Sequence, residues 1–210
     1  RGVDTEEFSP KPKDRKLLEK YHIGKDERII ITVANLVPIK GIEILLDAFE
    51  VLSNNHDSIR LIIVGDKEND YGRAMEEKAL NSQFSENIHF TGKVQNVVEY
   101  YSIAGLFVFP SLERGEGSPV ALLEAIASGL PVVASDVPGV RDILCKYPAY
   151  LFPAESTNNL FKKLNQWFES GSANNSSTEL MNYVKNKYNI EKEVQMHENI
   201  YDSILGFKKI

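Results

Sequence analysis

Uninterrupted apolar runs alternate with helical segments over roughly the first 150 residues, and this alternation constrains the fold more than any other feature. The runs Ile29–Ala34, Ile59–Val64 and Leu106–Phe109 contain at most one polar residue each. Strands that are covered on both faces of a parallel sheet read in this way. Residues 41–53 lie between the first two runs and repeat apolar side chains with the period of a helix. The chain is therefore predicted to be α/β, with a doubly wound parallel sheet in three α/β/α layers and right-handed crossovers.

Further short elements complete this prediction, and only helices are expected after Phe152. The remaining strands are placed at Ile88–Thr91, Pro131–Ala134 and Tyr150–Phe152. The helices are placed at Lys13–Tyr21, Gly41–Ser53, Tyr71–Asn81, Val97–Ile103, Pro119–Ser128, Val140–Cys145, Ser156–Glu169, Ser177–Tyr188 and Ile190–Leu205. We expect residues 1–210 to form one domain, which 42% hydrophobic residues can supply with a core. Residues 1–12 read as a polar connector with two prolines.

The composition restricts the binding partners and the cellular compartment that we expect. The net charge of −6 argues against binding to a nucleic-acid backbone. Cys145 is the only cysteine, so no internal disulfide can form, and we expect it to be a small apolar filler on a helix. Without a signal-peptide pattern or an apolar run of about 18 residues, a cytoplasmic location is expected. The chain starts without Met in what reads as a loop, so we expect a fragment of a longer protein.

The segment from Phe109 to Val133 reads as strand, polar loop, helix, turn and strand. Ser118 is a good N-cap, and Pro119 is a good first helical residue because its ring presets φ. Gly129 is expected to end the helix. A loop that leads into a helix N-terminus binds anions, because the first N–H groups lack partners and the macrodipole places partial positive charge there.

The residues around this helix terminus favour a phosphate flanked by hydroxyl groups. The backbone N–H groups of Val120 and Ala121 are the expected phosphate donors, and Gly117 allows a close approach to the backbone. Glu116 lies just before the helix. Glu124 lies about one turn inside it, and a helical side chain points back toward the N-terminus. A carboxylate in this place is suited to accept hydrogen bonds from the hydroxyls of a ribose or another sugar.

The whole ordered string resembles the signature of glycosyltransferase family 4, the retaining sugar-nucleotide enzymes of GT-B type with two Rossmann-like domains. Its parts are Pro110-Ser111, the pair Glu116 and Glu124 with seven residues between them, and the run Ala127–Val133. The beginning of the chain, with Gly2-Val3-Asp4-Thr5 and Phe8, is similar to the interdomain connector of that family. Residues 189–210 resemble the closing helix that crosses back toward the first domain.

The resemblance implies a fold, a reaction and roles for individual residues. The chain would be the Rossmann-like, donor-binding C-terminal half of an enzyme that moves a sugar from a nucleoside diphosphate to an acceptor with retention. No metal or other cofactor is expected. Glu116 would contact the transferred sugar, Glu124 the ribose, and Lys40 the diphosphate, with Glu116 and Lys40 as the catalytic pair. Further donor contacts are assigned to Gly117, Ser118, Pro119, Val120, Ala121, Gly92, Lys93 and Val94, the last three lying against the nucleobase.

One position departs from the family pattern. The family carries an Arg, about five residues later a Lys, and then Gly. Here Lys40-Gly41 matches, but Asn35 stands at the Arg position. Two interpretations stay open: Lys40 and the helix terminus suffice for the diphosphate, or Arg114 substitutes for the missing cation. Asn35 also leaves room for a nucleotide-binding module without transferase activity.

Other sites have less support in the sequence. Gly115-Glu116-Gly117 starts a dinucleotide-binding string, but Val120 stands where the third glycine is required, so an oxidoreductase is a weaker alternative. Acidic residues from Asp66 to Glu77 fall at calcium-loop positions, but Tyr71 replaces the obligatory glycine. By resemblance the partners are a nucleotide sugar and, through a missing N-terminal domain, a sugar, lipid-linked or small-molecule acceptor. Peripheral contact of the intact enzyme with the cytoplasmic membrane face stays open, as do the nucleobase and the sugar.

Overall fold

Six parallel strands form one sheet in the computed structural model, which describes residues 2–113, 119–170 and 176–205. The strand order across the sheet is β3-β2-β1-β4-β5-β6. The strands are β1 (Arg28–Val33), β2 (Ile59–Val64), β3 (Ile88–Gly92), β4 (Leu106–Phe109), β5 (Val132–Ser135) and β6 (Leu151–Phe152). The doubly wound parallel sheet predicted from the apolar runs is confirmed.

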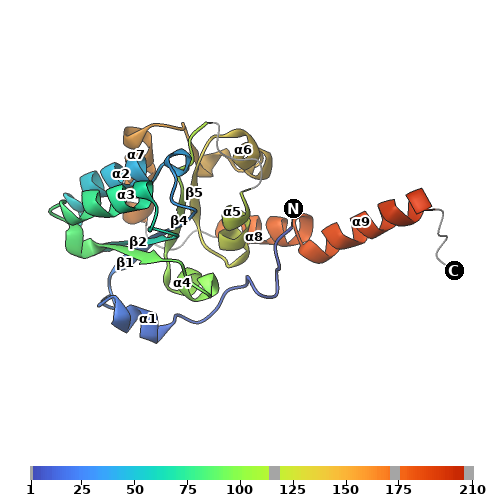
Figure 1. Ribbon diagram of the computed structural model, residues 1–210, viewed down its shortest axis with the longest axis horizontal. Coiled ribbons are helices and arrows are strands. Elements are labelled where there is room, and N and C mark those ends of the chain that lie inside the picture. Colours follow the sequence, from blue (N-terminus) through green and yellow to red (C-terminus); the bar gives the residue numbers. More distant parts are fainter. Residues whose placement is uncertain (1, 114–118, 171–175, 206–210) are drawn as a thin grey trace.

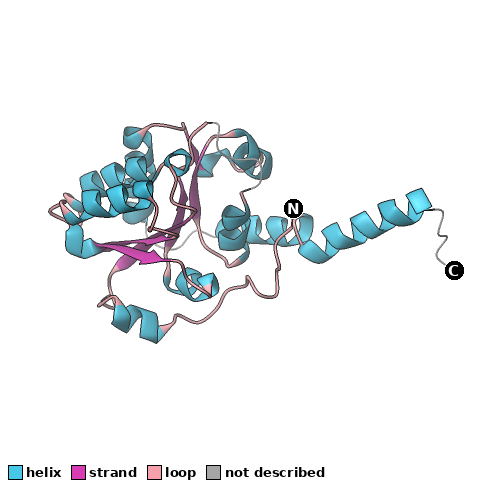
Figure 2. Ribbon diagram, viewed as in Figure 1, coloured by secondary structure: helices cyan, strands magenta, loops and turns pink. Residues whose placement is uncertain are grey.

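Helices cover both faces of the sheet and form the two outer layers (Figures 1 and 2). They are α1 (Arg15–Lys20), α2 (Ile42–Ser53), α3 (Asp70–Leu80), α4 (Val97–Ile103), α5 (Val120–Ala127), α6 (Pro138–Leu144), α7 (Thr157–Ser170), α8 (Ser176–Lys187) and α9 (Ile190–Leu205). Short 3-10 turns lie at Pro38–Lys40, Ser85–Asn87 and Pro148–Tyr150. No helix in the described part of the chain is long and apolar enough to cross a membrane.

The sheet separates two hydrophobic cores. Successive strand residues point to opposite faces, so Ile29 and Ile31 of β1 join one core while Ile30 joins the other. The first core is closed by α4, α5, α6 and α8, and the second by α2, α3 and α7. Because both faces of every central strand are buried, the strands need apolar residues at every position, which explains their uninterrupted runs.

Strand β1 is the point where the winding of the sheet reverses. It pairs with β2 on one side, from where the sheet continues to β3, and with β4 on the other side, from where it continues to β5 and β6. In such sheets the crevice between the loops that leave the two central strands binds ligands. The loops after β1 and β4 are therefore the first place to look for a site.

The beginning of the described chain meets the junction between α8 and α9. The Val3 N–H donates to the Tyr188 carbonyl at 2.7 Å, and the Ile190 N–H donates to the Val3 carbonyl at 3.0 Å. Val3 and Phe8 are buried, so the predicted polar connector carries two apolar anchors. Beyond this junction α9 extends away from the rest of the protein (Figure 1), and none of its residues is buried.

Two local expectations are wrong. Cys145 is exposed at the C-cap of α6, because α6 already ends at Leu144, and it does not fill a core. Pro119 is the N-cap of α5 and not its first helical residue, since ψ of 72° at Pro119 is not helical. The predicted cap Ser118 lies outside the described residues. The other predicted elements are found with boundaries that differ by at most two residues.

Candidate functional site

The loops that follow β1 and β4 touch each other at the carboxyl edge of the sheet. The Leu112 N–H donates to the Ile39 carbonyl at 2.8 Å. Gly41 has φ of 64°, and a Cβ built on it would lie 2.0 Å from the Pro110 carbonyl oxygen. Only a residue without a side chain permits this approach of two backbones. The glycine after Lys40 is therefore required by the packing of the two loops.

This contact brings Lys40 to the end of β4. The Lys40 ammonium lies 5.9 Å from the ring centroid of Phe109, the last residue of that strand. Lys40 is partly buried at the end of its 3-10 turn, just before α2. The predicted phosphate-binding lysine and the segment that leads to α5 thus lie on the same side of the switch point.

The start of α5 is a helix N-terminus, where the first N–H groups have no acceptor inside the helix. The Pro119 carbonyl accepts from the N–H groups of Leu122 at 3.1 Å and Leu123 at 3.2 Å. Because the helix begins at Val120, the N–H groups of Val120 and Ala121 precede its repeating hydrogen bonds. Arg114, Glu116, Gly117 and Ser118 lie outside the described residues, so their predicted roles, including that of Glu116, stay predictions.

The Glu124 carboxylate lies beside the first turn of α5, as the side-chain direction predicts. Its Oε2 accepts a hydrogen bond from the Tyr101 hydroxyl at 3.2 Å, and the same hydroxyl lies 3.3 Å from the Ala121 carbonyl. Burial raises the pKa of Glu124; the Tyr101 hydrogen bond acts in the opposite direction, and the charge of Glu7 adds to the rise. The pKa of Tyr101 is raised well above its ordinary value by burial and by this carboxylate.

The predicted nucleobase loop lies on the same edge, beyond β2. The Gly65 N–H donates to the Gly92 carbonyl at 3.2 Å, which joins the ends of β2 and β3. The Lys93 ammonium pairs with the Asp66 carboxylate at 2.9 Å and thereby lowers the pKa of Asp66. Val94 packs partly buried against the core behind it. Lys93 is therefore turned toward an acidic neighbour, which the sequence did not reveal.

Asn35 is the second residue after β1 and is exposed, with its carbonyl accepting from the Val37 N–H at 2.9 Å. The edge therefore carries, in order of strands, Gly92–Val94 after β3, Asp66 after β2, Asn35 and Lys40 after β1, and the start of α5 after β4. All predicted donor residues within the described ranges lie on this one edge.

Two residues of the site were not assigned to it from the sequence. Tyr101 lies on the helix predicted at Val97–Ile103; its ring is buried, but helical spacing gives no sign that its hydroxyl reaches Glu124. Ser135 is fully buried at the end of β5, and its hydroxyl lies 3.1 Å from the Phe109 carbonyl and 2.6 Å from the Ser111 carbonyl. Ser135 thereby fixes the backbone of residues 109–111, where the chain leaves β4.

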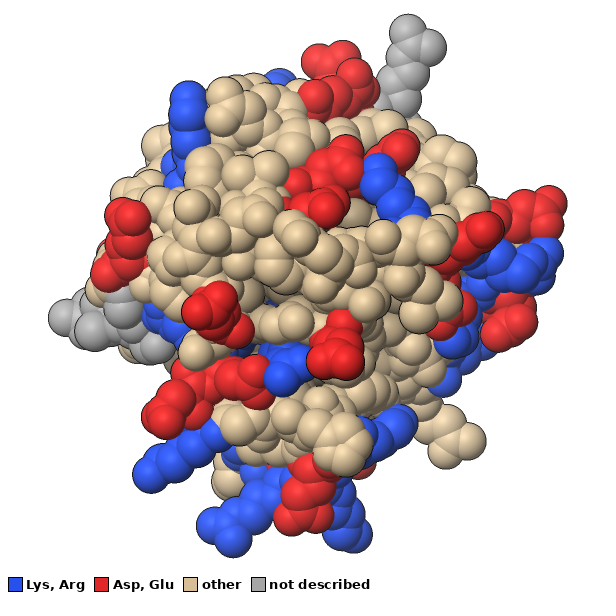
Figure 3. Space-filling model, turned by 90° about the vertical axis from the view of Figure 1, so that its left-hand side faces the viewer, with Lys and Arg blue, Asp and Glu red and all other residues tan. Residues whose placement is uncertain are grey.

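No group of three or more His, Cys, Asp or Glu residues in the described ranges is placed to hold a metal ion. Figure 3 shows acidic and basic side chains interspersed over one face of the molecule, and neither sign of charge forms a continuous patch on that face.

Comparisons with known proteins agree with this geometry. The family model for "Glycosyl transferases group 1" matches residues 13–202. A GDP-mannose-dependent alpha-(1-6)-phosphatidylinositol monomannoside mannosyltransferase of Mycobacterium tuberculosis is 31% identical over 149 residues, which cover 67% of this chain and 38% of that protein.

Solved structures share the fold. A glycosyltransferase from Rickettsia africae superposes with a TM-score of 0.89 at 20% identity, covering 99% of this chain and 57% of the other. Anabaena Alr3699/HepE, solved with UDP-glucose, superposes with a TM-score of 0.83 at 18% identity, covering 98% and 56%. The chain thus spans about half or less of the lengths of these three proteins.

A pair of glycine substitutions tests the contact between the two loops. Gly41→Ala and Gly92→Ala both place a side chain at positive φ, 64° and 73°, which costs about 1–2 kcal/mol in each. Only Gly41→Ala also drives a Cβ into a carbonyl, whereas the nearest atom to a Cβ at Gly92 is 4.0 Å away. In urea unfolding, Gly41→Ala should lower the free energy of unfolding by at least about 2 kcal/mol more than Gly92→Ala does. Equal losses would contradict the contact.

The raised pKa of Glu124 predicts that Glu124→Gln raises the free energy of unfolding in a pH-dependent way. The folded state holds the carboxyl proton more tightly than the unfolded chain, so this group's contribution to stability is full below its ordinary pKa of 4.5. The contribution is lost as pH rises through the folded pKa. Glu124→Gln should therefore unfold with a higher free energy than the wild type at pH 7, and this gain should vanish near pH 4.

Urea unfolding at both pH values measures this difference. The control is Glu77→Gln, which changes an exposed glutamate of α3 and should alter the free energy of unfolding by less than about 0.5 kcal/mol at either pH. A gain at Glu124→Gln that persists unchanged at pH 4 would show that ionisation is not its cause.

Proposed function

The chain belongs to the group 1 glycosyltransferase family, and we propose that the carboxyl edge of its sheet binds a nucleoside diphosphate sugar. The observation that carries the proposal is the contact between the loops after β1 and β4, with a Cβ on Gly41 meeting the Pro110 carbonyl. It places Lys40 near the end of β4, the strand before α5. The first N–H groups of α5 have no acceptor inside the helix, and its first turn lies beside the Glu124 carboxylate. A cation, a helix terminus and a hydroxyl acceptor then converge at the switch point of the sheet.

Each part of this arrangement has a distinct task in sugar transfer. The first turn of α5 and Lys40 hold the diphosphate and stabilise the charge that it gains when the bond to the sugar breaks. Glu124 accepts the ribose hydroxyls, Gly92–Val94 line the nucleobase, and Glu116 contacts the transferred sugar. Arg114 remains the candidate for the cation that Asn35 does not supply.

The class of donor is supported by the relatives. The Mycobacterium tuberculosis relative is GDP-mannose-dependent, and the Anabaena structure contains UDP-glucose. Both are nucleoside diphosphate sugars with different bases, so the shared diphosphate and ribose are the features that we extend to this chain.

We propose that the acceptor binds to a domain that precedes this one. The chain spans about half or less of the lengths of the proteins compared above, and α9 extends from it with apolar residues exposed. These residues are Ile190, Val194, Met196, Ile200, Tyr201, Ile204 and Leu205. We propose that residues 1–12 connect to that domain, that α9 packs on it, and that residues 2–205 alone bind donor without transfer.

The intact enzyme would then transfer the sugar with retention in the cytoplasm. Its acceptor is a sugar, a lipid-linked sugar or a small molecule, with peripheral membrane contact for a lipid acceptor. The mycobacterial relative is named for a phosphatidylinositol mannoside. Transfer should need no metal, so an assay of the two-domain protein should keep its rate in EDTA. A rate that depends on added Mg²⁺ would refute this.

A nucleotide-binding module without transfer is the second candidate, and Asn35 favours it because one expected cation is replaced there by a neutral side chain. Asn35→Arg in the two-domain protein separates the candidates. A rate that appears only in Asn35→Arg identifies a binding module, whereas a wild-type rate identifies an enzyme.

Nucleotide titration of the 210-residue chain tests the donor site itself. UDP, GDP, ADP, CMP and NAD are added while backbone amide NMR shifts are recorded. One nucleoside diphosphate should bind with Kd on the order of 0.1–1 mM, with shifts concentrated at residues 120–122 and 92–94. Lys40→Gln should weaken this binding about fivefold, since a cation beside the diphosphate is lost, and should leave binding of the nucleoside alone unchanged.

Lys16→Gln on α1 is the control, because it removes an exposed lysine far from the switch point. It should leave the affinity unchanged. Binding of NAD with shifts at the same residues, and none with the diphosphates, would favour the oxidoreductase alternative instead.

A further inference from the structure

We propose that Tyr101 is a positioning residue whose hydroxyl holds the Glu124 carboxylate in the orientation that receives the two ribose hydroxyls. This inference rests on the proposed function, because it assigns a supporting partner to the residue that would bind the ribose. Tyr101 itself touches neither the sugar nor the diphosphate.

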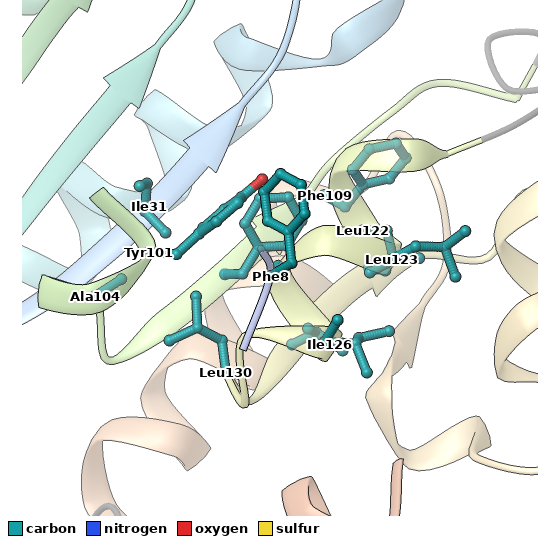
Figure 4. Close-up of a cluster of buried hydrophobic side chains, with 14 of the residues drawn as sticks. Phe8, Ile31, Tyr101, Ala104, Phe109, Leu122, Leu123, Ile126 and Leu130 are labelled. Atoms are coloured by element: carbon teal, nitrogen blue, oxygen red, sulfur yellow. The ribbon is translucent and has the colours of Figure 1, made fainter. Parts of the chain in front are cut away.

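The ring of Tyr101 is fixed by its surroundings. Its exposed fraction is 2%, and it packs edge-on against Phe8 at 6.2 Å and Phe107 at 5.9 Å between ring centroids. Figure 4 shows the ring between the strand residues and Phe8, with its hydroxyl directed toward the start of α5. A ring that is held by α4, β4 and the connector cannot swing its hydroxyl away, so the oxygen is a fixed point in the site.

The hydroxyl proton has two acceptors within reach, and their chemistry differs. Oε2 of Glu124 lies at 3.2 Å and the Ala121 carbonyl at 3.3 Å. An ionised carboxylate is the stronger acceptor, so the proton goes to Glu124 while that group is charged. The bond then fixes one carboxylate oxygen and favours the ionised form against the burial and the nearby Glu7 charge that oppose it.

A carboxylate that is held in this way still has room for a diol. Its two oxygens offer about four acceptor positions, and Tyr101 occupies one of them. Without the hydroxyl, Glu124 would have to lose more side-chain freedom when the nucleotide binds, and this entropic cost would appear as lower affinity. The loss should therefore be specific to ligands that carry ribose hydroxyls.

The test compares UDP and GDP with their 2′,3′-dideoxy forms in calorimetric titrations of the full chain. Tyr101→Phe removes one oxygen and keeps the packed ring, and it should weaken binding of the ribonucleotide about fivefold while leaving the dideoxy form unchanged. Tyr100→Phe is the matched control. It removes the hydroxyl of the neighbouring buried tyrosine, which bonds Tyr21 at 3.2 Å and not Glu124, and it should change neither affinity.

Glu124→Gln separates a failure of this inference from a failure of the proposed function. If Glu124→Gln weakens the binding of ribonucleotide and dideoxynucleotide equally, or weakens the binding of neither, Glu124 does not bind the ribose and the proposed role is wrong. If Glu124→Gln is ribose-specific but Tyr101→Phe leaves the ribonucleotide affinity unchanged, the positioning role is wrong. Equal weakening of both ligands by Tyr101→Phe would mark a structural role only and also overturn the inference.

A second measurement needs no ligand. Carbon-13 NMR of the Glu124 side-chain carboxyl follows its titration in the wild type and in both tyrosine variants. The groups identified around it are Tyr101 on α4 and Glu7 on the connector, and Glu7 is the same in all three proteins. Tyr101→Phe should raise the pKa of Glu124 because a hydrogen bond to the ionised form is lost, and Tyr100→Phe should not. An unchanged pKa in Tyr101→Phe would refute the positioning contact.

Discussion

The pairing of β1 with β4 is the constraint on which the candidate site depends. Crossover helices separate these strands by more than 70 residues of chain, yet Ile30 and Ile31 lie in register with Leu106 and Phe107. Their loops consequently leave the sheet side by side, and Gly41 must lack a side chain for the two backbones to pass. Lys40 then lies near Phe109 at the end of β4, the strand that precedes α5.

The ionised carboxylate of Glu124 destabilises the fold in its present surroundings. Glu124 is partly buried next to the apolar ring of Tyr101 and within reach of the Glu7 charge, and both burial and that charge oppose its ionised form. The Tyr101 hydroxyl offsets part of this cost. Binding of hydroxyls, the role proposed for Glu124, would give this charge a use. Stability and ligand binding therefore place opposite demands on the same side chain.

Several features of the site followed from local rules and were therefore predictable. The apolar run before Pro110 became β4, and Gly129 ends α5 with φ of 85°. The carboxylate of Glu124 lies beside the first turn because side chains on any helix lean toward its N-terminus. Contacts between elements that are distant in the sequence were not predicted. Lys93 pairs with Asp66, which follows a different strand, and the Tyr101 hydroxyl reaches a helix that begins almost twenty residues later.

By itself the sequence determined the strands, the helices, the layering of the sheet and the helix that carries Glu124, because hydrophobic period, caps and turns act over a few residues. Only the tertiary structure decided which strands are neighbours. Every buried parallel strand presents the same apolar pattern, so no local signal distinguishes β4 from β3 as the partner of β1. The strand order, set by packing of the two cores as a whole, brought Lys40 to the end of β4 and the Tyr101 hydroxyl to Glu124.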